Sequence, residues 1–94
     1  MTRDEEVVLC NKAIEHYKPA NQVVQAIEEL GELQQALARF LNDRANNVEE
    51  EIADVEIMII QLKIIFNLSK IDNWREYKLT RLKDRISNNE WFRY

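Results

Sequence analysis

The chain of 94 residues is long enough for one domain but buries too little apolar surface to be comfortably stable alone, so we expect a partner subunit. Hydrophobic residues make up 46% of the sequence and charged residues 32%, as in globular proteins, and a single glycine and a single proline leave too few turn residues for a β-rich fold. The net charge of −4 argues against non-specific binding of nucleic acid, and an anionic substrate would need a cation between it and the protein.

The hydrophobic spacing predicts an all-α protein with four helices, expected in chain order over 2–16, 19–42, 47–68 and 71–87. Pro19 stands where the second helix would begin, a position at which its missing N–H costs nothing. Asn47, with Glu50 three residues later, has the form of a capping box at the start of the third helix. The aromatic tail over 91–94 is expected to pack against the rest of the domain.

The expected third helix carries two apolar stripes. The first consists of Val48, Ile52, Val55, Ile59, Leu62 and Phe66, and the second of Ala53, Ile57, Ile60, Ile64 and Leu68. A helix that is apolar nearly all round is buried on both sides, and three neighbours of ordinary length could hardly cover it. We therefore expect a homo-oligomer, a dimer or a tetramer, rather than a monomeric four-helix bundle with this helix at its centre.

The cysteine content, the N-terminus and the lengths of the apolar runs indicate where the protein resides in the cell. Cys10 is the only cysteine, which excludes an internal disulfide and a multi-cysteine metal site, and the N-terminus shows no signal-peptide pattern. No apolar run approaches the roughly 20 residues that a membrane span needs. The sequence thus predicts a single cytoplasmic domain over 1–94 that does not bind membranes.

Two pairs of acidic residues, each with a spacing of three, lie beside the apolar stripes of the second and third helices. Glu29 and Glu32 form the first pair, and Glu51 and Asp54 form the second. Like charges at this spacing repel one another, so a purely structural helix gains nothing from either pair. If the two helices pack antiparallel, both pairs can meet at one level and offer four carboxylates to a hard cation such as Mg²⁺ or Mn²⁺.

Most of these acids also have a structural explanation. Glu51 and the two glutamates before it suit the positive end of a helix dipole, and Glu28 suits a solvated face. Asp54 lies beyond the first turn, between apolar residues, where a poor helix former needs another reason. Gly31 interrupts the second helix at a cost of about 1 kcal/mol, which the close approach of another helix near the acids would offset. Together these features favour a functional site.

The same residues resemble a known family. The run EELGE at 28–32, followed after 18 intervening residues by EIAD at 51–54, is similar to the EExxE…ExxD signature of the MazG-like all-α nucleoside triphosphate pyrophosphohydrolases. The resemblance extends from about Tyr17 through Arg85, and the run KLTRL at 78–82 is also similar to small single-domain members of phages and bacteria. It implies a four-helix fold that oligomerises and hydrolysis of a nucleoside triphosphate to a monophosphate and pyrophosphate.

The resemblance also implies roles for particular residues. It makes Glu29, Glu32, Glu51 and Asp54 the ligands of a Mg²⁺ site, and Glu28 or one of these four could be the base that activates the attacking water. On the last helix, basic residues recur at a spacing of three and four and could bind the triphosphate, or could form a solvated face instead. The expected substrate-binding residues are Gln22 and Gln25 near the nucleobase and Lys78, Arg81 and Arg85 near the phosphates.

Three other interpretations stay open. A phosphoribosyl-ATP pyrophosphatase shares the fold and the acids but is expected to have a Tyr-His pair shortly after its aspartate, where this chain has VEIM at 55–58. A di-iron bundle needs Glu-x-x-His pairs, and the residue three before His16 is Ala13. In a non-enzymatic helical interaction module the acids would be mere surface, and a metal titration would find no saturable site.

Overall fold

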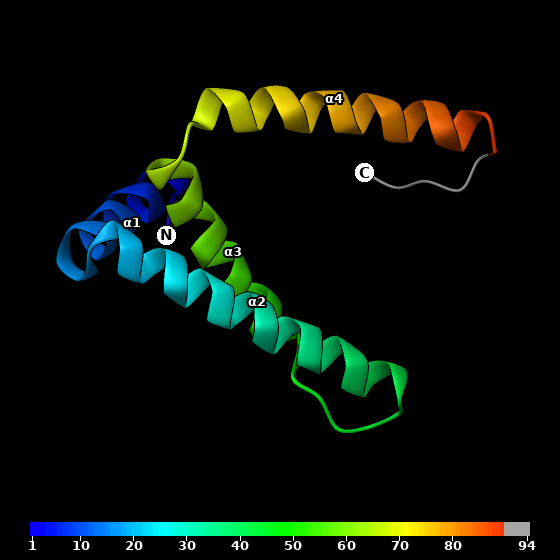
Figure 1. The fold of residues 1–94 in the computed structure, drawn as a ribbon, viewed down its shortest axis with the longest axis horizontal. Helices are drawn as coiled ribbons and strands as arrows, with labels where there is room; N and C mark the ends of the chain where they lie inside the picture. Colours follow the sequence, from blue (N-terminus) through cyan, green and yellow to red (C-terminus); the bar gives the residue numbers. More distant parts are fainter. Residues whose placement is uncertain (90–94) are drawn as a thin grey trace.

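The computed structural model describes residues 1–89 (Figure 1). Over these residues the protein is all-α and contains no strand, as the sequence predicts. Its four helices are α1 (Arg3–Tyr17), α2 (Pro19–Leu41), α3 (Val48–Ile65) and α4 (Leu68–Ser87). No helix of this part of the chain is long and apolar enough to cross a membrane. The expected packing of the aromatic tail concerns 91–94, which lie outside the described residues.

The helices form an open arrangement built on a hairpin of α2 and α3. These two helices run antiparallel along one another, and α1 packs on both (Figure 1). Within residues 1–89, α4 contacts only α3, and it extends away from the hairpin. The radius of gyration is accordingly 16.1 Å, whereas a compact domain of this length has about 12 Å.

The boundaries of the helices agree with the sequence at the start of the chain and differ between α3 and α4. Pro19 does begin α2. The third helix was expected to continue to position 68, but it ends at Ile65, and α4 begins at Leu68 instead of 71. The reason is Asn67, whose side-chain oxygen accepts a hydrogen bond from the backbone N–H of Lys70 at 3.0 Å and so caps a new helix.

The expected capping box at the start of α3 is wrong. Asn47 occupies the N-cap position, but its side chain accepts no hydrogen bond from the helix backbone. Its amide nitrogen instead donates to Oε1 of Glu50 at 3.0 Å and to Oε1 of Glu51 at 2.8 Å. The side chain thus orients the acids of the first turn, while Oδ1 of Asn46 accepts from the backbone N–H of Val48 at 3.3 Å.

The core of this single chain is small. Its buried apolar residues are Cys10, Ala26, Ala36 and Met58, and they are accompanied by buried Gln22, Glu51 and Gln61. Much of α2 stays exposed on an apolar face, for example Ile27 at 64% and Leu41 at 79%. The chain exposes 7882 Å² in all, and a compact protein of 11.3 kDa exposes about 5,700 Å². The excess is of the size that a subunit interface would cover.

The most buried face of α3 is neither of its two apolar stripes. Glu51, Met58 and Gln61 lie on the buried face, and the stripes flank it. Ile52 of the first stripe is 43% exposed and Ile57 of the second is 51% exposed. The alternative of a monomeric bundle that buries this helix on both sides therefore does not describe the single chain.

Candidate metal site

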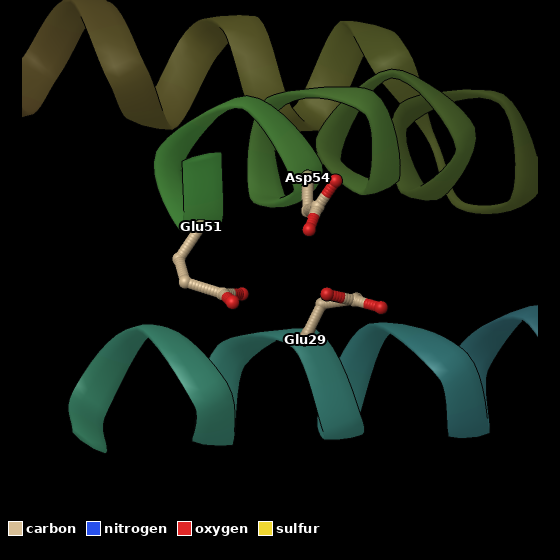
Figure 2. A group of neighbouring side chains, drawn as sticks. All are labelled: Glu29, Glu51 and Asp54. Atoms are coloured by element: carbon tan, nitrogen blue, oxygen red, sulfur yellow. The ribbon is translucent and has the colours of Figure 1, made fainter. Parts of the chain in front are cut away.

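Three carboxylates from the two central helices face one another (Figure 2). Glu29 projects from α2, and Glu51 and Asp54 project from α3 on the opposite side. One oxygen from each carboxylate can be chosen so that all three lie within 4.8 Å of one another. The expected meeting of the acids across an antiparallel helix pair is confirmed for these three residues.

Glu51 is the most buried of the three. Only 7% of its surface is exposed, and a short bond from Asn47 fixes its Oε1. Its other oxygen, Oε2, is buried and has no hydrogen-bond partner. A buried ionised oxygen without a partner costs several kcal/mol at most positions, because it loses water and gains nothing in return. The second oxygen of Glu51 is therefore available to a cation.

Glu29 repeats this arrangement from the other helix. The side-chain amide of Gln25, one turn earlier on α2, donates to its Oε1 at 2.9 Å. Its Oε2 is buried and has no partner. Each of the two glutamates thus has one oxygen held by an amide and one oxygen left free. Two free oxygens and the carboxylate of Asp54 form a set of hard ligands on fixed backbones.

The spacing of these oxygens suits a small divalent cation. In an octahedral Mg²⁺ site, with metal–oxygen distances of about 2.1 Å, opposite ligands lie about 4.2 Å apart. Any three ligands of an octahedron include adjacent pairs, which lie only about 3.0 Å apart. Carboxylate oxygens no more than 4.8 Å apart would therefore have to close by up to about 2 Å, a movement that rotation of the glutamate side chains can supply. The residues present therefore fit Mg²⁺ or Mn²⁺, with positions left over for water and phosphate.

Glu32 lies beside the cluster and is coupled to it. Its side chain is exposed, and it does not belong to the group of three. The negative charge of Glu29, followed by that of Glu51, raises the pKa of Glu32 above its ordinary value of 4.5. The fourth expected ligand thus stands at the solvent side of the site, within the field of the other carboxylates. Glu28 is exposed and outside the group.

The structure separates the two glutamines that were expected to bind the nucleobase. Gln22 is buried, and its amide nitrogen donates to Oε1 of Gln61 on α3 at 2.7 Å. That bond holds α2 and α3 together and leaves Gln22 unavailable to a ligand. Gln25 orients Glu29, so it belongs to the acid cluster. The orienting role of Asn47 was missed, although its position four residues before Glu51 places both on one helix face.

The basic residues expected to hold the phosphates lie on a helix that extends away from the acid cluster of their own chain. Lys78, Arg81 and Arg85 lie on α4, which makes no contact with α2. The Nζ of Lys78 lies 5.9 Å from the centre of the Trp74 ring, and the Cζ of Arg81 lies 5.7 Å from that of Tyr77. The structure brings the acids together and leaves the basic helix apart.

The expected close approach at Gly31 is also absent from the single chain. A Cβ built on this residue would meet no atom within 4 Å. The space beside Gly31 is therefore open, and the cost of a glycine within α2 is not offset by packing among the described residues.

Comparison with family models, curated proteins and solved structures gives no match to this chain. The described geometry nevertheless defines a class of site, a carboxylate cluster on an antiparallel helix pair that could hold a metal ion.

Proposed function

We propose that the protein is a Mg²⁺-dependent nucleoside triphosphate pyrophosphohydrolase of the MazG-like kind, which releases pyrophosphate and a nucleoside monophosphate. The observation that carries the proposal is the convergence of Glu29, Glu51 and Asp54, with buried and unpartnered oxygens on both glutamates. The EExxE…ExxD pattern of the sequence supports it, because three of the five acids that match this pattern, Glu29, Glu51 and Asp54, come together.

The residues of the site divide into ligands and residues that position them. Glu29, Glu51 and Asp54 would hold the cation, with Glu32 at its solvent side. Bound Mg²⁺ supplies charge neutralisation on the phosphate chain and activation of a water molecule. Asn47 and Gln25 each hold one carboxylate oxygen, so that the other oxygen points to the cation.

The proton of the attacking water must pass to a base on the exposed side of the cluster. Glu28, next to Glu29 in sequence, and Glu32, three residues after it on α2, both have exposed side chains and are the candidates. Their separate replacement by glutamine distinguishes them, because loss of the base lowers the rate without abolishing binding of the metal.

The decisive experiment is a panel of canonical and modified nucleoside triphosphates, assayed for pyrophosphate release with Mg²⁺. We expect monophosphate and pyrophosphate in equal amounts, and no diphosphate or orthophosphate. The Asp54→Asn variant should lose this activity, whereas Glu49→Gln, which changes no proposed ligand, should keep it. Saturable binding of Mg²⁺ without hydrolysis of any member of the panel would contradict the proposed reaction.

A second candidate function is a non-enzymatic helical interaction module. It is favoured by the large exposed apolar surface, including Ile27, Leu41 and Ile57. A homo-oligomer accounts for the same surface, and we propose that the protein acts as one. A titration with Mg²⁺ separates the two functions, since an interaction module has no need of a saturable cation site between α2 and α3.

A further inference from the structure

Of the four helices, α4 has the fewest packing contacts with the rest of the single chain. It carries three large side chains that its own chain leaves exposed, Trp74 (63%), Tyr77 (57%) and Ile86 (65%). The Nε of Arg81 on the same helix is buried and has no hydrogen-bond partner. An isolated helix with this surface is stabilised by packing, and the described part of its own chain offers contact only with α3.

The charges of α4 are opposite to those of the central hairpin. Six basic and three acidic side chains give α4 a net charge of +3. Eight acidic and two basic side chains give α2 and α3 together a net charge of −6. The surfaces are therefore complementary, and the acid cluster has no basic residue of α4 beside it in its own chain.

The lengths of the helices also match. With a rise of 1.5 Å per residue, Asp54 and Glu51 lie about 17 and 21 Å before the end of α3 at Ile65. Lys78 and Arg81 lie about 15 and 20 Å after the start of α4. An α4 that runs antiparallel along the hairpin from this junction brings its basic residues level with the acids. The connection of only two residues, 66–67, is extended in this structure and leaves α4 turned outward.

We propose that α4 is exchanged between two copies of this chain, so that Lys78 and Arg81 of one copy stand at the acid cluster of the other. The exchange rests on the proposed function, and it makes the two basic side chains the phosphate-binding residues of a site shared by two subunits. It also uses the open connection between α3 and α4, since a helix that does not fold back on its own chain can pack in the same register on a partner. The surface in excess of a compact monomer is larger than the about 800 Å² per partner that a standard interface buries.

The test uses Mn²⁺ as a paramagnetic probe on full-length chains. ¹⁵N-labelled Asp54→Asn chains, which lack a proposed ligand, are unfolded and refolded together with unlabelled wild-type chains. The metal then sits on the wild-type copies. With exchange, it broadens the amide signals of Lys78 and Arg81 in the labelled copies more strongly than that of Leu68. Labelled Asp54→Asn chains without the wild type are the control and should stay sharp.

The reciprocal sample contains labelled wild-type chains diluted into an excess of unlabelled Asp54→Asn chains. Exchange predicts sharp α4 signals there, because the metal lies next to α4 of the unlabelled partner. Broadened α4 signals would show that α4 folds back on its own chain. Sharp α4 signals in both samples with Mn²⁺ bound would show that α4 stays apart. Either result overturns the exchange and leaves the metal site standing, whereas wild-type chains that bind no Mn²⁺ overturn the proposed function and the exchange with it.

Discussion

Replacement of Asp54 by asparagine should make the metal-free protein more stable. The carboxylate of Asp54 lies within 4.8 Å of those of Glu29 and Glu51. At that separation each repulsion is worth about 1 kcal/mol in a fully aqueous dielectric and about 3 kcal/mol at an effective dielectric constant of 20. Because Asp54 keeps part of its contact with solvent, we take the lower figure as a minimum, and two repulsions then amount to about 2 kcal/mol.

The assay is thermal unfolding with and without Mg²⁺, at one fixed protein concentration. A gain of about 2 kcal/mol corresponds to a rise in Tm of roughly 8 °C or more for a domain of this size. Mg²⁺ at a hundred times its Kd should stabilise the wild type by about 2.7 kcal/mol and should leave Asp54→Asn nearly unchanged. Glu49→Gln is the matched control, because it removes one charge from the same helix but no proposed ligand.

Two results would refute this reasoning. If Asp54→Asn is less stable than wild type without metal, the three carboxylates do not repel one another as their spacing requires. If Mg²⁺ stabilises Asp54→Asn and the wild type equally, or if Glu49→Gln loses the response as well, the cation interacts with a general negative surface and not with a site.

Three further predictions concern pH, packing and assembly. The pKa of Glu32 is raised in the folded chain, so ionisation of this residue lowers stability; Glu32→Gln should be more stable than wild type at pH 7, and urea unfolding should show the difference vanishing below about pH 4.5. Gly31→Ala should raise the metal-free Tm by roughly 4–8 °C, because alanine gains about 1 kcal/mol in a helix and its Cβ meets open space; a lower Tm would place a second copy against Gly31. Light scattering at micromolar concentration should give at least a dimer, which Ile57→Glu or Ile64→Glu should shift to smaller species, and a wild-type mass of about 11 kDa would disprove the assembly.

The acid cluster could be predicted from sequence because it depends on local spacing. Glu51 and Asp54 share a face of one helix at a separation of three, and the short connection after α2 forces an antiparallel neighbour. Glu29 then meets Glu51 and Asp54 if it lies at the same level along the hairpin. These constraints act within a hairpin, so they do not require knowledge of the remaining fold.

The path of α4 could not be predicted in the same way. Its helical pattern is plain, but its direction depends on two backbone residues at 66–67 and on a cap by Asn67 that the continuous apolar pattern of α3 concealed. The sequence showed basic residues at the right spacing to bind phosphate. It contained nothing that distinguishes packing on the same chain from packing on a second one, because both use the same faces.

The interior of the α2–α3 hairpin is polar, which explains why the largely apolar helix α3 buries so few apolar side chains. Gln61 of α3 bonds to Gln22, and Glu51 bonds to Asn47 while keeping one oxygen free. A buried polar pair with satisfied partners fixes the register of two helices, because a slip of one turn leaves each partner unsatisfied. That register is also what holds Glu29 level with Asp54 across the hairpin. The interface between α2 and α3 thus contains polar contacts that align the carboxylates in place of apolar contacts. The apolar stripes of α3 stay exposed and are free to pack against another copy.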